Sequence, residues 1–442
     1  MGSLWRRDTT APNGQSLRGD LRVDAAVIGG GMAGILTARA LAEEGLHTAV
    51  LEARALGSGQ TGNTTAKITA QHGLIYTRLI RQLGESRARL YARANQEAVE
   101  EYRRLARSGI NCDFMDCPAY LYSRVRELPL VREDGACRAL GLETAFTLTT
   151  TLPFPVKGAV RMEGQAMLHP LKFLYGAARG LEVYEHTPVL TAEEDCLTTP
   201  HGTVSARYVV FACHYPFVNF PGLYFTRMHQ ERSYVAAVSG APQLDGIYYG
   251  VDPGGLSFRN AGDYLLVGGG GHPTGQGAEH SPYQTLEDQA KALWLNAVPA
   301  ARWSAQDCVT LDGLPYIGQY ARSTPDLYVA TGFGKWGMTL SMAAATILRD
   351  LVLGRSNPCV LLFSPSRSMM KPQLLVNGFE AAVSLLTPTR PRCPHMGCAL
   401  KWNLQEHTWD CACHGSRFTR EGKLISGPAA GDLPSVPPQK SK

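Results

Sequence analysis

The sequence lacks several features that would place it in a specialised class of protein. No apolar run is long and clean enough to span a bilayer, since the longest uncharged stretch, residues 208–226, is interrupted by prolines at 216 and 221. The opening stretch has no apolar core of a secretory signal, so we expect a cytoplasmic protein without a membrane span. A formal net charge of +5 over 442 residues is small and does not indicate nucleic-acid binding. No internal repeat or low-complexity segment is present.

The composition is that of a folded protein with more than one domain. Hydrophobic residues make up 44% and charged residues 18% of the chain, which excludes a disordered protein. A chain of 442 residues has room for two or three domains. In the expected reducing compartment, clustered cysteines among the eleven suggest a metal site before a disulfide.

The order of the expected elements is as follows. Residues 1–22 are interpreted as a polar, poorly ordered N-terminal tail. A buried strand, "VDAAVI", a helix over 32–45 and a second strand, "HTAVLEA", form a β–turn–α–β unit with two parallel strands. Helices are expected over 76–108 and 336–354, many short strands between about 118 and 310, and a linker after 355.

A glycine turn joins the first strand to the first helix. Gly29, Gly31 and Gly34 give G-x-G-x-x-G, in which the glycines allow a tight turn, a close approach to pyrophosphate and close packing of helix on strand. Glu52 ends the second strand, where a carboxylate can accept hydrogen bonds from a ribose. The alternative is a merely structural turn. The other glycine run, 268–271, lacks the third glycine of the pattern, so one dinucleotide is predicted.

Three segments resemble the D-amino-acid-oxidase (DAO) superfamily of FAD-dependent oxidoreductases: "GSGQTGNTTAKITAQHG", "ARYVVFACHYP" and "LDGLPYIGQYARSTPDLYVATGFGKWGMTLSMAAATILRDLVLG". The resemblance covers about residues 24–355 and implies FAD as the dinucleotide. It implies that a glycine turn and helix N-terminus near the end of this region stabilise anionic reduced flavin. The flavin or pyrophosphate contacts implied are Gly332, Phe333, Gly334 and Gly337, with Gly59, Thr61, Asn63 and Thr64. A plain turn is the alternative for the glycines.

The resemblance does not identify a substrate. In one branch of the superfamily an arginine about eight residues before "PYIG" holds a substrate carboxylate, and Asp307 stands there in this chain. Arg259, His72 and Lys67 are candidate catalytic groups, each with an ordinary structural role as the alternative. Trp336 either shields the flavin or belongs to the core.

A second cluster of chemistry-bearing residues lies near the C-terminal end. Cys393-x-His395 and Cys411-x-x-His414 offer two thiolates and two imidazoles, a set that zinc accepts. A Cys-x-His pair is unlike the usual C-x₂₋₄-C zinc spacing. The flanking residues in "CPHMGC" and "CACHGSRF" instead resemble the two cluster loops of Rieske iron–sulfur proteins.

That resemblance implies a 2Fe-2S cluster. The cysteines would hold one iron and the histidines the other, and neutral histidines raise the potential to about −150 to +300 mV. It also implies a disulfide between Cys398 and Cys413, with free thiols as the alternative, and a hydrogen bond from Ser416 to cluster sulfur. Phe418 replaces a tyrosine common in respiratory proteins, so we expect a lower potential.

The predicted architecture is an α/β Rossmann-like FAD-binding domain with an inserted α+β substrate domain, followed by a small all-β Rieske domain. We expect a DAO-like domain over 23–355, with a substrate subdomain at roughly 76–155 and 226–306. A linker, 356–385, precedes the Rieske domain, 386–442, whose base is shortened because helix and loop precede the first cluster loop. The predicted function is oxidation of a small organic substrate, such as an amine, by hydride transfer to FAD, with single electrons relayed through the cluster to an acceptor or from a donor protein. A non-catalytic redox sensor or electron-transfer protein is the alternative; a Rieske oxygenase is disfavoured because paired histidines for a mononuclear iron are missing.

Overall fold

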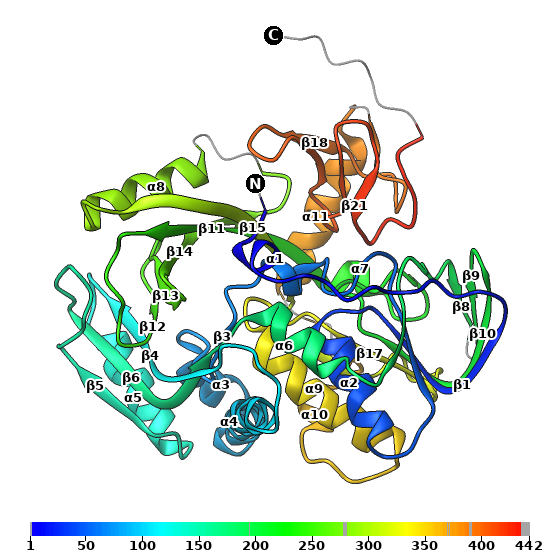
Figure 1. Ribbon diagram of the computed structural model, residues 1–442, viewed down its shortest axis with the longest axis horizontal. Helices are drawn as coiled ribbons and strands as arrows, with labels where there is room; N and C mark the ends of the chain where they lie inside the picture. Colours follow the sequence, from blue (N-terminus) through cyan, green and yellow to red (C-terminus); the bar gives the residue numbers. More distant parts are fainter. Residues whose placement is uncertain are drawn as a thin grey trace.

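The computed structural model describes residues 2–193, 195–276, 281–368, 370, 372–388 and 391–434. Three sheets organise this part of the chain, with eight, nine and four strands. The first two sheets and their helices form the body, and the third sheet lies against one side of it (Figure 1). The predicted α/β body with a small β-rich C-terminal domain is confirmed.

The first sheet is the dinucleotide-binding part and is mostly parallel. Its order is β16-β17-β10-β1-β2-β7, and β1 pairs in parallel with both β2 and β10. The crossover helix α2 (Met32–Ala42) joins β1 to β2 and packs against α9 (Gly337–Val352). The strands are β1 (Leu21–Ile28), β2 (Thr48–Leu51), β7 (Glu182–Tyr184), β10 (Gly202–Phe211), β16 (Tyr316–Gln319) and β17 (Leu327–Thr331), with β8 (Thr191–Ala192) and β9 (Cys196–Thr199) attached through β10. The carboxyl ends of β1, β2, β10 and β17 therefore meet at one edge.

The second sheet is the inserted part, and it is mostly antiparallel. Its order is β15-β11-β14-β13-β12-β4-β6-β3, with β5 on β6. Its strands are β3 (Lys67–Ile68), β4 (Met115–Ser123), β5 (Thr144–Thr147), β6 (Gly158–Met167), β11 (Met228–Ser239), β12 (Ile247–Gly250), β13 (Ser257–Ala261), β14 (Tyr264–Pro273) and β15 (Val298–Thr310). The glycine run 268–271 lies within β14, which agrees with the prediction of a single dinucleotide turn.

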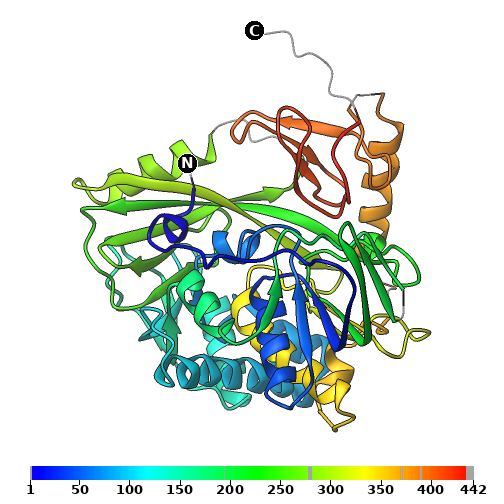
Figure 2. The ribbon, with the colours of Figure 1, turned by 45° about the vertical axis from the view of Figure 1, so that its right-hand side comes forward.

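Helices fill the space around both sheets (Figures 1 and 2). Those expected over 76–108 and 336–354 are present as α3 (Ile75–Leu83), α4 (Glu85–Arg107) and α9. The long helix α4 buries one face against α9 and α3, as its spacing of apolar residues predicts. The others are α5 (Leu128–Ala139), α6 (Pro170–Ala177), α7 (Tyr224–Arg227), α8 (Pro282–Leu293) and α10 (Val360–Phe363), with a 3₁₀ turn, η1 (Gln60–Asn63).

The N-terminal residues differ from the poorly ordered tail expected from their polarity. The short helix α1 (Leu4–Arg7) buries Leu4 and Trp5, which are 1% and 2% exposed. Trp5 donates its indole N–H to the carbonyl oxygen of Thr64 at 2.7 Å. Two apolar side chains among polar neighbours are therefore enough to fix this segment on the body.

The C-terminal domain is a small antiparallel sheet, and the helix α11 (Pro372–Leu386) precedes it, largely within the segment expected as a linker. The sheet runs β18 (Leu400–Asn403), β19 (Thr408–Cys411), β20 (Arg417–Phe418) and β21 (Leu424–Ser426). In both ribbon views this domain lies beside β11 and β15 (Figures 1 and 2). Among the residues described, no helix combines the length and the apolar character that crossing a membrane requires.

Candidate functional site

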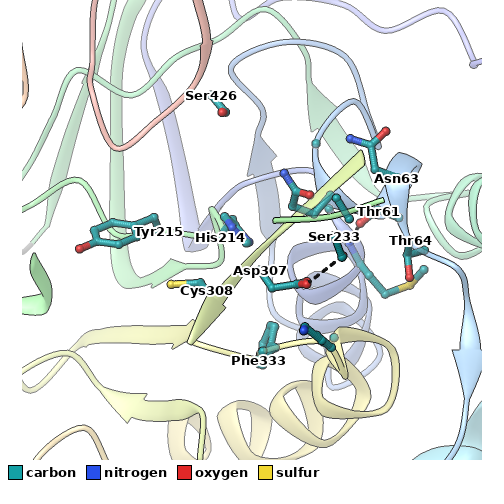
Figure 3. A pocket seen from close by; sticks show the side chains of 18 of the residues that line it. Thr61, Asn63, Thr64, His214, Tyr215, Ser233, Asp307, Cys308, Phe333 and Ser426 are labelled. Carbon is teal, nitrogen blue, oxygen red and sulfur yellow. Dashed lines mark hydrogen bonds between the residues drawn. The ribbon is translucent and has the colours of Figure 1, made fainter. Parts of the chain in front are cut away.

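A cavity of about 1100 Å³ opens where the two large sheets meet. It is lined by the residues that follow the parallel strands β1, β2, β10 and β17, which is where open α/β sheets bind their ligands. The inserted sheet supplies the opposite wall through β11, β12, β14 and β15. Figure 3 shows side chains from both sheets facing this space.

The glycine turn after β1 is shaped to accept a dinucleotide. Gly29 has φ +115°, and a Cβ there would lie 2.7 Å from the carbonyl oxygen of Ala212. A Cβ on Gly34 would lie 1.8 Å from the carbonyl oxygen of Gly29, so helix α2 packs directly on the turn. Gly29, Gly31 and Glu52 line the cavity, whereas Gly34 serves the packing beneath it. The residues present fit a bound FAD at this edge.

The loop after β2 and the turn after β17 complete this part of the site. All four loop candidates, Gly59, Thr61, Asn63 and Thr64, line the cavity, as do Phe333, Gly334 and Gly337. Gly332 lies behind them, where φ is +75° and a Cβ would meet Thr310 at 2.3 Å. The loop is held from outside: Trp303 donates to the carbonyl oxygen of Asn63 at 2.8 Å.

Charged side chains gather at the end of the cavity formed by the inserted sheet. Asp307 lines it, with Ser233 as a weak donor at 3.5 Å, and burial raises the pKa of this carboxyl to about 7 (Figure 3). Lys335 lies beside it and pairs with Glu231 at 3.3 Å. Tyr249 and Trp336 form an aromatic corner of the same cavity, with ring centroids 5.3 Å apart. A carboxylate and aromatic rings that line one cavity are groups that attract a cation.

Lys67 is the sequence candidate that reaches the cavity. Its Nζ donates to the hydroxyl of Ser257 at 2.9 Å, and Ser257 also lines the cavity. Burial lowers the pKa of this amine to about 7, with the nearby Arg259 guanidinium adding to the effect. A lysine of this kind exchanges a proton near neutral pH.

The other two catalytic candidates, Arg259 and His72, lie outside the cavity lining. Arg259 is 3% exposed, and its guanidinium donates to the carbonyl oxygens of Thr65, Ala66 and Leu168 at 2.7–3.1 Å. The side chain is therefore bound to the backbone and does not line the cavity. His72 stacks behind Trp336 at 4.6 Å. It donates to the carbonyl oxygen of Thr69 and accepts from the hydroxyl of Tyr91, and burial lowers its pKa to about 3. The polar atoms of both side chains are therefore engaged by neighbouring protein groups, and a catalytic role for either stays a prediction.

The two C-terminal loops repeat one hydrogen-bond pattern. The amide of Gly397 donates to the carbonyl oxygen of Cys393 at 2.9 Å, and that of Gly415 to the carbonyl oxygen of Cys411 at 3.0 Å. Both glycines have positive φ, +75° and +80°, which suits glycine at the end of such a turn. Each turn therefore presents a cysteine and a histidine toward the other loop.

The histidine pair fits an iron–sulfur cluster. The rings of His395 and His414 lie 4.9 Å apart at 90°, and the Nδ1 atom of each is buried without a hydrogen-bond partner among the described residues. Two orphaned ring nitrogens are the expected donors to one iron. The Nε2 of His395 is held by Asn219 of the body at 2.9 Å. The hydroxyl of Ser416 contacts the sulfur of Cys393, and its hydrogen bond to cluster sulfur stays a prediction.

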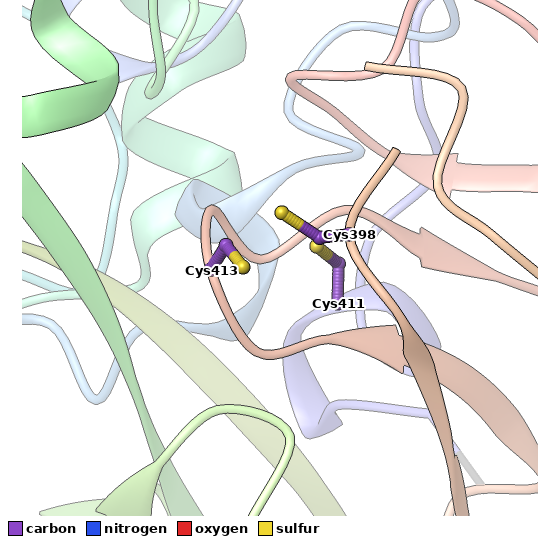
Figure 4. Close-up of side chains that lie close together, drawn as sticks. All are labelled: Cys398, Cys411 and Cys413. Carbon is purple, nitrogen blue, oxygen red and sulfur yellow. The ribbon is translucent and has the colours of Figure 1, made fainter. Parts of the chain in front are cut away.

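The thiols lie close together but are not bonded to one another in the structure. The sulfur atoms of Cys398, Cys411 and Cys413 are within 4.8 Å of one another (Figure 4). The sulfur of Cys393 contacts that of Cys411, with which it is expected to hold one iron. The disulfide between Cys398 and Cys413 stays a prediction.

The paired strands β11 and β15 form a wall with one face toward the cavity and the other toward the C-terminal domain. Strands β11 and β15 pair with Glu231 opposite Asp307 and Arg232 opposite Gln306. Because side chains alternate along a strand, Ser233 and Asp307 face the cavity while Arg232 and Gln306 face the C-terminal domain. The wall thus presents one face to each site.

Gln230 lies on the same face of β11 as Arg232 and contacts both sites. Its Nε2 donates to the carbonyl oxygen of His414 at 2.8 Å, and its Oε1 accepts from Nε2 of His214 at 3.3 Å. His214 lines the cavity, as does Tyr215, whose ring meets that of His414 edge-on at 6.2 Å. One hydrogen-bonded link therefore connects the cavity to a residue of the cluster loops.

Several of these residues were missed from the sequence. His214 follows β10, a parallel strand whose carboxyl end adjoins the turn at Gly29, and this position is the signal that identifies it. Gln230, Lys335 and Arg232 carry no comparable local signal. Their roles depend on which strand face meets which domain.

Comparisons with known proteins match both the body and the C-terminal part of the chain. The family model DAO, FAD dependent oxidoreductase, matches residues 24–351, and the Rieske [2Fe-2S] domain model matches residues 385–437. YhfW of Bacillus subtilis (strain 168), whose description names a Rieske 2Fe-2S iron-sulfur protein, is 33% identical over 497 aligned residues, covering 98% of this chain and 97% of that protein.

Solved structures share the fold of the body. Glycine oxidase from Geobacillus kaustophilus superposes with a TM-score of 0.63 at 22% identity, over 79% of this chain and 99% of that one. L-proline dehydrogenase from P. horikoshii has a TM-score of 0.66 at 17% identity, over 79% and 98%. The chain belongs to the DAO family of FAD-dependent oxidoreductases, and it is an FAD enzyme that also carries a Rieske [2Fe-2S] domain.

Proposed function

We propose that the protein oxidises a small organic amine at FAD and passes the electrons singly through the Rieske cluster to a partner. FAD supplies two-electron oxidation by accepting hydride, and the cluster supplies one-electron exchange. The observation that carries the proposal is the link from His214 through Gln230 to His414. It supports direct communication between the two centres within one chain.

The amine is favoured by the charges of the cavity. Arg54 is the one arginine in the described lining and lies at the dinucleotide end, and Lys335, the lysine beside Asp307, is already paired with Glu231. Asp307 stands at the other end with the aromatic corner of Tyr249 and Trp336. An ammonium group would be attracted by this carboxylate, whereas a substrate carboxylate would be repelled.

Lys67 is the proposed proton acceptor. With a pKa of about 7 it is partly neutral at physiological pH, and its Nζ can take a proton from a bound ammonium group. The amine nitrogen then carries the lone pair that favours loss of hydride from the neighbouring carbon. Ser257 holds the lysine in place through its hydroxyl.

The electron partner is proposed to be a protein, either an acceptor or a donor. A cytoplasmic location and the absence of nucleic-acid partners remain predictions, which cell fractionation and pull-down with intact chain would test. The disulfide at Cys398 and Cys413 is testable by mass spectrometry of unreduced protein.

The test is anaerobic titration of the purified holoprotein with amines, amino acids and reduced pyridine nucleotides, followed by visible and EPR spectra. An amine should bleach the flavin and then produce the signal of a reduced Rieske cluster. In His395→Ala or His414→Ala the flavin should still bleach. If amines leave the flavin oxidised while amino acids reduce it, the amine proposal is wrong. If no organic donor supports steady turnover, the redox-sensor alternative replaces it.

A further inference from the structure

The Rieske domain forms part of the wall of the FAD cavity. Nine consecutive residues, 424–432, line the same cavity as Gly29 and Glu52. Figure 3 shows Ser426 of this segment at the cavity. The hydroxyl of Ser426 has no hydrogen-bond partner among the described residues, so it is available to a bound group.

Residues 424–432 contact the loop after β2, which carries Glu52, the residue expected to accept hydrogen bonds from the ribose of FAD. Arg54 donates from its guanidinium to the carbonyl oxygen of Ile425. The carboxylate of Glu52 accepts from the amides of Gly30 at 2.6 Å and Arg54 at 2.9 Å. Residues 424–432 are therefore linked to the glycine turn through Arg54 and Glu52.

The same segment is tied to the cluster loops. The amide of Ala429 donates to the hydroxyl oxygen of Ser416 at 3.0 Å, and Ser416 follows the second cluster loop directly. Asp432 accepts from Lys423 and from the amide of Leu424, both at 2.8 Å. A displacement of residues 424–432 would therefore also displace Ser416 and the second cluster loop.

A second, buried contact fixes the domain on the far side of β11. Arg232 is 0% exposed and pairs with Glu406 at 2.6 Å and Asp410 at 3.4 Å. Arg417 pairs with the same two carboxylates at 2.7 and 3.3 Å. Removing one member of such a buried network leaves uncompensated charge, so the network acts as an interdomain lock.

We propose that residues 424–432 belong to the FAD-binding site, so that FAD binding and docking of the Rieske domain stabilise each other. A ligand that contacts the domain only when it is docked must favour the docked state, and docking must raise the affinity for FAD by the same factor. The interdomain lock, which does not line the cavity, then controls FAD affinity from a distance. The coupling requires only FAD binding and is independent of the substrate and of the electron relay.

The first test uses the full wild-type chain after removal of FAD. Hydrogen exchange is measured in β18 and β19, which do not line the cavity, with and without added FAD, relative to β5 in the body. We expect FAD to slow exchange in β18 and β19 by about tenfold relative to β5. Equal protection of β5 and the two Rieske strands would overturn the proposal.

The second test uses Arg232→Met, with Arg103→Met as the matched control. Arg103 also pairs with two carboxylates, Glu100 and Asp116, but within the body. FAD affinity, followed by quenching of flavin fluorescence, should fall about tenfold in R232M and stay unchanged in R103M. Unchanged affinity in an R232M protein whose Rieske domain exchanges faster would overturn the coupling. If R232M does not fold, the wild-type exchange measurement decides alone.

Discussion

Gln230 donates its side-chain amide to the carbonyl oxygen of His414 at 2.8 Å, across 184 residues of sequence. The bond joins the wall strand β11 to a histidine of the Rieske domain. Because Gln230 also accepts from His214 in the FAD cavity, it contacts both redox sites at once. Gln230 thus ties a cavity-lining side chain to a cluster loop.

Replacement of Gln230 by Leu removes both hydrogen bonds while keeping similar volume. Each bond contributes about 1 kcal/mol, so the local contact between cavity and cluster loop should loosen. We expect a several-fold slower appearance of reduced cluster in stopped-flow spectra, with unchanged reduction of FAD by substrate. Gln243→Leu is the control, since Gln243 also donates to a carbonyl but lies exposed, away from the Rieske domain. Equal rates in Q230L and Q243L would contradict the role of Gln230.

Replacement of His414 by Ala should abolish the cluster but not the flavin. The Nδ1 of His414 is one of two buried nitrogens without a partner among the described residues, and loss of that ligand leaves one iron with a single imidazole. Iron content and the EPR signal should disappear, while the flavin absorbance remains. His407→Ala, an exposed histidine of the same domain, should retain both. Full iron in H414A would favour another ligand set, including the three close thiols.

Asp307→Asn should impair amine binding. The change keeps the shape and removes the charge that would pair with an ammonium group. A hydrogen bond to a charged group contributes about 1.5–3 kcal/mol, so KM for the amine should rise about 10- to 100-fold. The control is Asp263→Asn on an exposed turn. An unchanged KM in D307N, measured at a pH above 8 where the wild-type carboxyl is ionised, would remove Asp307 from the substrate site.

The rate of FAD reduction should rise with pH through about 7. The pKa of Asp307 is raised to about 7 and that of Lys67 is lowered to about 7, so the carboxylate and the neutral amine both form as pH increases past this value. Anaerobic rates with an amine that stays protonated below pH 9 test this directly. Lys67→Met should lower the maximal rate of FAD reduction that is reached above pH 8. The increase in rate caused by ionisation of Asp307 should persist in this variant. A wild-type rate that falls as pH rises from 6 to 8 would contradict both assignments.

Much of each site was predictable because its signals are local. The turn from Gly29 to Gly34 and the loops around Cys393 and Cys411 carry their chemistry within a few residues, and the structure forms those turns. The fold class follows from the same local patterns. In these places backbone geometry requires specific residues, so the sequence shows them directly.

The contacts between distant segments could not be predicted in this way. Arg232 and Glu406 are 174 residues apart, and nothing near either one indicates the other. Arg259 and His72 are close in sequence to residues that line the cavity. Their side chains nevertheless donate hydrogen bonds to backbone carbonyl groups outside the lining. Which face of a strand or loop meets a ligand depends on packing that no single segment encodes.

The most direct test of the account is rapid-freeze EPR after anaerobic mixing of the holoprotein with a limiting amine. We predict that the Rieske signal appears after flavin bleaching with a first-order rate that does not change over a tenfold range of protein concentration, as transfer within one chain requires. A cluster that stays oxidised, or a rate that scales with protein concentration, would contradict it.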